Sequence, residues 1–458
     1  MSALSKTSQK DNEIHPLIEE EVNSMLEASE EYENNEEMRV GIESEFGVLD
    51  GFEGSSSEAR DRGIEDVGFA DRELGAAMAE TQTDPMTLDS LSDLEIALGG
   101  RENILAEQMS EEGLSLIRYG THPFVDVDNI QTTDRERYDV LVNTFDNLRE
   151  QNIGELPNFG KDEQIDPNTA AIPAGICSTQ TNIQAEGFED AVDKTNYAEM
   201  VLPYAIALSG NSRIVEGKDT GLSDTRMQLW EMNYNNSETP YKVGPLEGYI
   251  QDSRDWFSRL DIYFEDEDED PDHLEDAISE HWKDVRIKLE EDPDTEEEYP
   301  VVEVRPLSMQ PSVAEETAVH GFMIGRIAYA QETDEDLILF EQVLANREKA
   351  LMDGLSTEEM FYNREGRSER EDLGAVLDEE ISRAEEGLKY LGIEDPGYMN
   401  ILRERLDQGT PSTQSADIFN GLRGQKHSTE EALRQSVPVI DEPSWSPQNL
   451  METHYDRK

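Results

Sequence analysis

Apolar residues alternate with polar or small residues through residues 39–50. Val40, Ile42 and Phe46 are separated by two and four positions, so all three have the same parity along the chain. Successive side chains of a strand point to opposite faces, so this pattern predicts a strand with an apolar face. Glu43 and Glu45 then share the opposite face. Two carboxylates held in this way suit a divalent metal ion, but a solvated acidic strand face would show the same pattern.

Two further alternating segments predict strands with polar faces. Residues 177–185 place a row of neutral hydrogen-bonding side chains on one face, which indicates ligand recognition: Ser178, Gln180, Asn182 and Gln184. Residues 299–306 are expected to pair with residues 281–288, with Glu303 and Arg305 on the face opposite Val302 and Val304. The second segment repeats the geometry of Glu43 and Glu45.

The residues between these strands are less regular. The Gly-, Ser- and acid-rich residues 51–66 are expected to form a mobile loop. Residues 73–85 fit a helix or a strand, and in either case Glu80 lies among small and apolar neighbours. Residues 116–128 predict a strand followed by a turn at His122, a residue expected to be structural.

Helical periodicity is found at both ends of the chain and between the strands. We expect helices at about 17–26, 87–112, 133–151, 189–208, 313–330, 337–344 and 373–391. Ser312 and Thr333 are predicted to cap the fifth and sixth of these. The sequence therefore predicts an α+β fold with an acidic N-terminal helical extension (1–37), one domain (38–425; sheet-rich to about 310, helical over 312–425) and a loosely ordered tail (426–458) in which Trp445 can dock.

The charge of the chain is far from balanced. Its 458 residues include 105 Asp and Glu against 38 Lys and Arg, which gives a formal net charge of −67. Salt relieves such self-repulsion, so we expect a salt-loving cytoplasmic protein. No basic cluster offers a surface for nucleic acid or an anionic membrane. A hydrophobic content of 36% and regular periodicity argue against a disordered acidic chain.

The N-terminus is polar, and the longest apolar stretches are too short to span a bilayer. We therefore expect a soluble, unexported protein. Cys177 is the only cysteine, which excludes an internal disulfide and a Cys-rich metal site. A small buried core residue is its expected role, with a redox role as the alternative.

Positive charge gathers in a glycine-punctuated segment at residues 210–226. Arg213, Lys218 and Arg226 suit phosphate or carboxylate oxygens there. Pairing with the acidic surroundings is the alternative. If the predicted strands form one antiparallel sheet, they line a concave basin whose carboxylates can hold Mg²⁺ and whose arginines can meet anions, as phosphoryl transfer requires. The sequence contains no P-loop and no dinucleotide fingerprint.

At this point the sequence resembles the glutamate-cysteine ligase and carboxylate-amine ligase family, over about residues 38–418. The resemblance rests on the order and spacing of short motifs: G-I-E-S-E-F (41–46), E-L-G-A-A-M-A-E-T (73–81), G-T-H-P-F (120–124), S-T-Q-T-N (178–182), A-L-S-G-N-S with G-K-D-T-G-L-S-D-T-R (207–226), V-E-V-R-P (302–306) and G-T-P-S-T-Q (409–414). It implies a glutamine-synthetase-like antiparallel sheet with a concave polar active-site face and helices on the other side. Residues 38–425 would then be a single ATP-dependent ligase domain.

The resemblance also implies roles for individual residues. Metal ions that grip the ATP phosphates would be Mg²⁺, or Mn²⁺, held by Glu43, Glu45, Glu80 and Glu303. Arg305 would stabilise the transferring phosphoryl group and, with Lys218, bind the nucleotide, so Glu45 and Arg305 are the expected catalytic residues. Arg226 would hold a carboxylate of the amino-acid substrate, and Gln180 and Asn182 would contact substrate. Where related carboxylate-amine ligases commonly have H-x-H, this chain has Gln180-Thr181-Asn182, which is similar to glutamate-cysteine ligases.

The expected reaction is therefore ATP-dependent amide formation between the γ-carboxylate of glutamate and the amine of cysteine, through an acyl phosphate, as in glutathione biosynthesis. The expected partners are small molecules: ATP, glutamate, and cysteine or another amine. Two alternatives stay open: a ligase with a different acid or amine, and a non-catalytic relative that binds a metal or small molecule.

Overall fold

The computed structural model describes residues 14–16, 18–31, 38–126, 129–135, 138, 142, 172–235, 242–260, 273–291, 298–364 and 367–446. Its centre is a nine-stranded sheet whose paired strands are all antiparallel. The strands along its path are β13 (Val439–Ile440), β5 (Leu114–Ile117), β1 (Val40–Asp50), β6 (Ser178–Gln184), β10 (Glu298–Ser308) and β9 (Val285–Glu291). β4 (Met78–Gln82) and β2 (Glu53–Gly54) also pair with β1, and β3 (Ala70–Arg72) pairs with β4. The sheet is curled into half of a barrel, and the predicted α+β class is confirmed.

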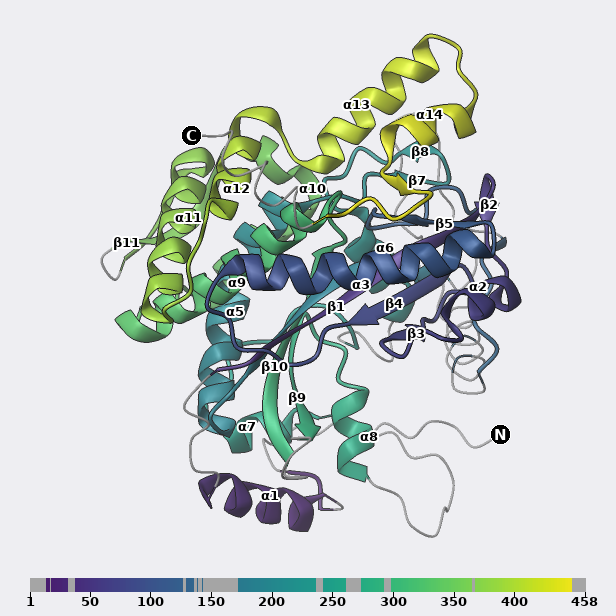
Figure 1. Ribbon diagram of the computed structural model, residues 1–458. Coiled ribbons are helices and arrows are strands. Elements are labelled where there is room, and N and C mark those ends of the chain that lie inside the picture. Colours follow the sequence, from purple (N-terminus) through teal and green to yellow (C-terminus); the bar gives the residue numbers. More distant parts are fainter. Residues whose placement is uncertain are drawn as a thin grey trace.

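One face of this sheet is covered by helices (Figure 1). Val40, Ile42 and Phe46 of β1 are buried, as the alternation of the sequence predicts. Helices α5 (Phe188–Ser209), α9 (Val313–Thr333) and α3 (Leu91–Glu111) pack on the strands. Outside them lie α10 (Phe340–Asp353), α11 (Leu373–Tyr390) and α12 (Tyr398–Gln408) (Figure 1). Glu43 and Glu45, which alternate with these buried residues of β1, therefore lie on the concave, polar face.

Helices α9 and α11 cross at unusually close range. A Cβ atom on Gly387 would lie 1.7 Å from the backbone oxygen of Gly325, so only glycine fits there. The side chain of Ser312 accepts a hydrogen bond from the backbone N–H of Glu315, which confirms the predicted cap of α9. Hydrophobic residues of α11 line the core side of that helix, as predicted.

A polar network is buried between the sheet and α9. Glu316 accepts hydrogen bonds from Ser44 of β1 (2.5 Å) and Thr179 of β6 (2.7 Å) and forms an ion pair with Arg118 (2.9 Å). His320 lies between Thr179 and Thr181, with 2.7 Å from each ring nitrogen to a hydroxyl oxygen. This network holds β1 and β6 in register directly behind the acidic residues of the polar face.

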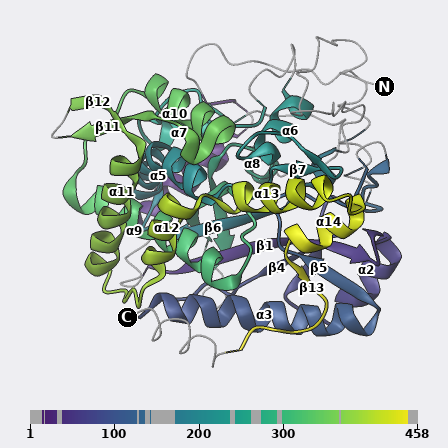
Figure 2. The ribbon, with the colours of Figure 1, turned by 90° about the horizontal axis from the view of Figure 1, so that it is seen from above.

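The remaining helices lie around the ends of the sheet: α1 (Glu19–Glu31), α2 (Ser57–Ile64), α6 (Thr225–Tyr234), α7 (Ser253–Ser258), α8 (His273–Ser279), α13 (Pro411–Gly424) and α14 (Thr429–Ser436). There are also two short 3-10 helices (Ile172–Gly175 and Gly354–Ser356) and two small hairpins, β7–β8 (Ile214–Val215 and Lys218–Asp219) and β11–β12 (Glu359–Arg364 and Arg367–Asp372). Seen from above, α13 and α14 lie beside β7 (Figure 2). No helix in the described part of the chain is both long and apolar enough to cross a membrane.

Three local predictions differ from the structure. Residues 57–64, expected within a loop, form α2, because the side chain of Ser56 caps its N-terminus. The helix expected at 337 begins instead at Phe340, without a side-chain cap from Thr333, because Asp334 has a left-handed backbone conformation that ends α9. Residues 429–440, expected in a loose tail, form α14 and β13, and Trp445 docks on α3, where its indole N–H donates to Glu95. Most of the helix predicted at 133–151 lies outside the described residues.

Candidate active site

Strand pairing brings the predicted site residues of four strands onto one face. Glu45 of β1 lies opposite Glu80 of β4, and Glu43 lies opposite Gln180 of β6. On the next strand, Glu303 of β10 lies opposite Asn182 of β6. Residues that are up to 260 positions apart in the sequence therefore form one continuous polar surface.

The first part of this surface, on β1 and β4, is acidic. One carboxylate oxygen of Glu45 accepts from the backbone N–H of Ser178 at 2.6 Å, and the other accepts from Gln180 at 3.1 Å. Glu80 accepts from the side chain of Gln82 at 3.2 Å. Glu73, at the start of the same motif as Glu80, lies close enough to act on both carboxylates. We call Glu43, Glu45, Glu73 and Glu80 the acidic group.

Burial and crowding make full ionisation of the acidic group costly. Burial, and then repulsion by Glu73, raise the pKa of Glu45 to about 7, against the hydrogen bond from Ser178 and the charge of Arg226. Burial, and then the charges of Glu73 and Glu43, raise the pKa of Glu80 well above its ordinary value. A cation placed among these carboxylates would offset both effects.

The second part of the surface, on β9 and β10, is basic around one carboxylate. Arg286 contacts both oxygens of Glu303, at 2.5 and 3.2 Å, and Arg305 contacts one of them at 2.5 Å. Lys288 lies 3.3 Å from Glu303 and 2.9 Å from Glu43. Although burial opposes it, the charges of Arg286, Arg305 and Lys288 hold the pKa of Glu303 well below its usual range. Glu303 with these three cations is called the basic group.

The neutral row on β6 joins the two groups. Gln180 donates from its amide nitrogen to Glu45, while its amide oxygen accepts from Arg305 at 3.2 Å. Asn182 donates to Glu43 at 3.0 Å, and within the described residues its amide oxygen is buried without a hydrogen-bond partner. The predicted polar row thus connects the acidic group to the basic group across the width of one strand.

Arg226 lies in the first turn of α6 and is 4% exposed. Burial lowers the pKa of its guanidinium, whose charge acts on Glu45 and Cys177. In the part of the chain that the structure describes, its Nε and Nη2 atoms are buried without a hydrogen-bond partner. A buried guanidinium whose N–H donors lack protein acceptors is a candidate binding site for an anion.

The other two basic residues of the segment 210–226 lie in or beside the β7–β8 hairpin. Arg213 pairs with Asp219 at 2.7 Å, and Lys218 pairs with Glu216 at 2.9 Å. These ion pairs agree with the alternative interpretation of the segment, in which its basic side chains pair with acidic neighbours. A role for Lys218 in nucleotide binding stays a prediction.

The acidic group fits a divalent metal ion by its donor chemistry, since Mg²⁺ prefers carboxylate oxygens. Among the residues that the structure describes, no three acidic, histidine or cysteine side chains are already arranged around a common point. Glu43, Glu45 and Glu80 stay the predicted ligands, and Glu73 is a fourth carboxylate that would be near such an ion. Glu303 is engaged by three cations, and its predicted role as a metal ligand stays a prediction.

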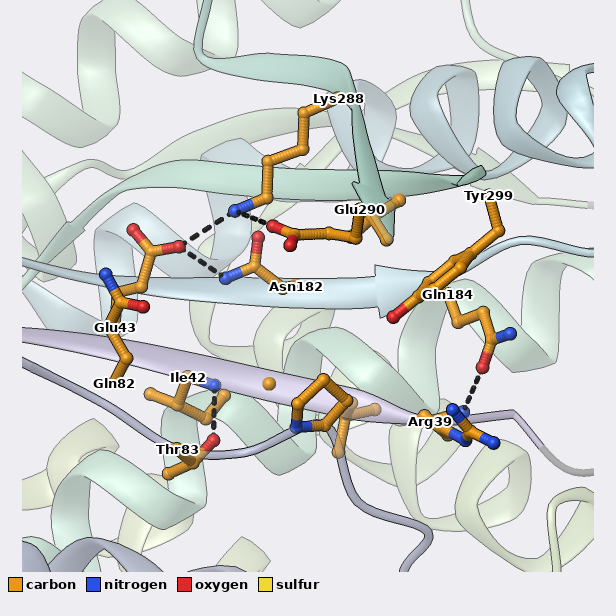
Figure 3. Close-up of a pocket in the computed structure, with 14 residues that line it drawn as sticks. Arg39, Ile42, Glu43, Gln82, Thr83, Asn182, Gln184, Lys288, Glu290 and Tyr299 are labelled. Atoms are coloured by element: carbon orange, nitrogen blue, oxygen red, sulfur yellow. Dashed lines mark hydrogen bonds and ion pairs between the residues drawn. The ribbon is translucent and has the colours of Figure 1, made fainter. Parts of the chain in front are cut away.

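A pocket of about 490 Å³, part of it open to solvent, continues the polar face towards the start of β1 (Figure 3). Glu43, Asn182 and Lys288 lie at one end of the pocket, where they also join the acidic and basic groups (Figure 3). Tyr299 and Gln184 lie at the other end (Figure 3). The pocket therefore offers an aromatic ring and amide groups next to concentrated charge.

Three residues of this site were not predicted from the sequence: Glu73, Arg286 and Lys288. Glu73 begins the motif that contains Glu80, so its position was a usable signal. Arg286 and Lys288 alternate with Val285 and Ile287 in the strand expected at 281–288. Their place in the site follows from their ion pairs with Glu303. The alternation of residues within one strand does not predict these ion pairs.

Comparison with known proteins agrees with this geometry. The family model of "Glutamate-cysteine ligase family 2 (GCS2)" matches residues 39–436. A protein of Jannaschia sp. (strain CCS1) named "Putative glutamate--cysteine ligase 2" is 23% identical over 415 residues, which cover 88% of this chain and 96% of that protein. A protein of the same name from Gloeobacter violaceus is 27% identical over 220 residues, 46% of this chain and 52% of that protein.

Among solved structures, the glutamate–cysteine ligase of Francisella tularensis in complex with AMP has the same fold. Its TM-score is 0.54 at 12% sequence identity, with 92% of each chain covered. The family match spans most of the chain and contains every residue of the acidic and basic groups. The chain belongs to glutamate-cysteine ligase family 2 and is an ATP-dependent carboxylate-amine ligase.

Proposed function

We propose that this ligase joins the γ-carboxylate of glutamate to the amine of cysteine. The observation that carries the proposal is the division of one concave face into an acidic and a basic group, with Arg226 beside Glu45, where its Nε and Nη2 atoms have no hydrogen-bond partner among the described residues. ATP phosphates suit the basic group, and the carboxylates of an amino acid suit Arg226. The Q-x-N sequence at Gln180 and Asn182 favours glutamate–cysteine ligases over relatives with other substrates.

In the first step, a γ-carboxylate oxygen attacks the γ-phosphorus of ATP, and the bond to the β-phosphate oxygen breaks, which releases ADP. Arg305 and Lys288 reduce the repulsion between the carboxylate and the phosphates, because their positive charges face the transferring group. The acidic group would hold Mg²⁺, or Mn²⁺, whose positive charge would further offset that of the phosphates.

In the second step, the amine attacks the carbonyl carbon of the acyl phosphate, and phosphate leaves while the nitrogen loses a proton. A free carboxylate is a poor electrophile, so activation by phosphate is required before the amide can form. Arg226 holds the α-carboxylate of the acid during both steps. The pocket lined by Tyr299 and Gln184 receives the nucleotide.

The net charge of −67 supports the further proposal that the enzyme works in a salt-rich cytoplasm. Activity is therefore to be measured in molar KCl. ADP release with ATP, Mg²⁺, glutamate and a panel of amines, followed by mass spectrometry of the products, tests the substrates. A γ-glutamylcysteine product is expected, whereas product formation only with another amine would overturn the assignment of cysteine.

Arg226→Gln tests the substrate pocket itself. We expect the KM for glutamate to rise about tenfold or more, while the KM for ATP changes little, because a buried charged contact to the acid is lost. Arg213→Gln is the matched control, since Arg213 pairs with Asp219 in a nearby hairpin. Equal effects of the two substitutions on glutamate would refute the role of Arg226. Glu45→Gln and Arg305→Ala are expected to abolish ADP release.

A further inference from the structure

A buried arginine of α10 connects the two segments that carry Arg226 and Arg305. Arg347 contacts both carboxylate oxygens of Asp284, with distances of 2.5 Å from Nε and 3.1 Å from Nη2. Its Nη2 atom also donates to Glu231 at 2.6 Å. Arg347 is 6% exposed and Asp284 is 1% exposed, so solvent screens these contacts little.

Asp284 links this arginine to the strand that carries Arg305. It lies directly before β9, and its backbone oxygen accepts a hydrogen bond from the backbone N–H of Arg305 at 2.9 Å. β10 changes its register against β6 between Val304 and Leu307. At this irregular point, the contact with Asp284 is what holds the backbone of Arg305.

Glu231 links the same arginine to the helix that carries Arg226. Both residues lie on α6, Arg226 in its first turn and Glu231 five residues later. The N-terminus of α6 is fixed separately, because the carboxylate of its cap Asp224 accepts from Ser308, at the end of β10, at 2.7 Å. Arg347 therefore fixes the other part of α6 against the same strand pair.

We propose that Arg347 is a positioning residue that sets the separation between Arg226 and Arg305, and so brings the acid substrate to the phosphoryl group. The inference rests on the proposed roles of Arg226 and Arg305. An arginine is required because one planar group must contact one carboxylate through two nitrogens and a second carboxylate at the same time. Lysine carries the charge but cannot hold both partners in one plane.

A third carboxyl group near Arg347 does not compete with Asp284 and Glu231. Glu199 of α5 lies near this arginine, but burial, and then repulsion by Asp284, raise the pKa of Glu199 to about 8. Burial thus disfavours a negative charge on Glu199, whereas Asp284 and Glu231 contact Arg347 directly.

Arg347→Lys tests the proposal, with Arg326→Lys as its matched control. Arg326 is equally buried and contacts both oxygens of Glu380, at 2.6 and 3.3 Å, and Glu335 at 2.7 Å, but it lies between α9 and α11 behind the sheet. Unfolding in urea gives the folded fraction of each variant. Then kcat, the KM for glutamate and the dissociation constant of ATP are measured on folded enzyme.

For Arg347→Lys we expect kcat to fall about tenfold or more and the KM for glutamate to rise, while ATP affinity stays within about threefold. For Arg326→Lys we expect kinetic constants within about twofold of the wild type. The double variant Arg226→Lys/Arg347→Lys is expected to lose less than the sum of the single effects on a logarithmic scale, because both act on one contact. Unchanged kinetic constants in folded Arg347→Lys, or fully additive effects, would overturn the proposal.

A wild-type enzyme that releases no ADP with any amine would refute the proposed substrates but not this inference. In that case, glutamate binding is measured by calorimetry in the presence of a non-hydrolysable ATP analogue. Weaker binding in Arg347→Lys alone would support the positioning role. Equal binding in the wild type and in both variants would overturn it.

Discussion

Glu316 lies at the centre of the polar network behind the active-site face, and its removal is expected to destabilise the fold. The side chain is fully buried between α9 and the sheet. It accepts hydrogen bonds from Ser44 and Thr179 and pairs with Arg118. Glu316→Gln keeps the size of the side chain but removes the charge that Arg118 faces. Arg118 would then keep Glu102 as a charged partner.

The expected loss follows from the acidity of Glu316. Although burial opposes it, the charge of Arg118 and the hydrogen bond from Ser44 lower the pKa of Glu316 from 4.5 to about 2. Each pKa unit corresponds to about 1.4 kcal/mol, so the charged form gains about 3 kcal/mol from its surroundings. Because the folded pKa lies below the unfolded one, this stability is present above about pH 4.5 and disappears as the pH falls towards 2.

The assay is equilibrium unfolding in urea at constant molar KCl. At pH 7, the free energy of unfolding of Glu316→Gln is expected to be about 3 kcal/mol lower than that of the wild type. This difference in the free energy of unfolding should shrink by about half between pH 5 and pH 3. The control is Glu58→Gln, because Glu58 is exposed and pairs with Arg62 on the surface, where about 0.5 kcal/mol or less is expected. A loss below about 1 kcal/mol that does not change with pH would refute the reasoning.

Three further predictions concern other parts of the molecule. Gly387→Ala should lower the free energy of unfolding by about 2 kcal/mol or more, since its Cβ would meet the backbone of Gly325, whereas the open helical position Gly421 should tolerate Ala in thermal unfolding. Cys177 should react with Ellman's reagent only in unfolded protein, because burial, and then the charge of Glu45, raise the pKa of its thiol. The midpoint of thermal unfolding should rise between 0.1 M and 1 M KCl, because salt screens a net charge of −67; an unchanged midpoint would contradict this.

The strands of the polar face could be predicted because each has one buried side. Val40 and Ile42 on β1 and Val302 and Val304 on β10 alternate with the ionisable residues, and burial of one face makes this period of two unambiguous. The register of the strands could not be predicted. That Glu303 meets Asn182, and Glu43 meets Gln180, depends on contacts between distant segments.

Glu80 shows how tertiary contacts override local preference. Its neighbours Ala76, Ala77, Met78 and Ala79 favour a helix in isolation, yet pairing with β1 makes this segment a strand. Two cations of the basic group were not predicted for a related reason. Arg286 and Lys288 look like ordinary solvent-facing residues of a strand until Glu303 and Glu43 are placed beside them.

The pairing of β13 with β5 has a consequence for synthesis of the chain. The other strands of the central sheet lie between residues 40 and 308, but the strand that covers the free side of β5 is at residues 439 and 440. During translation, Leu114 to Ile117 therefore offer an uncovered edge until almost the whole chain has emerged. Chains that end before residue 439 would expose the unpaired edge of β5, which can pair with the same edge of another chain. Interrupted synthesis therefore favours aggregation and degradation of the fragments over partly active enzyme.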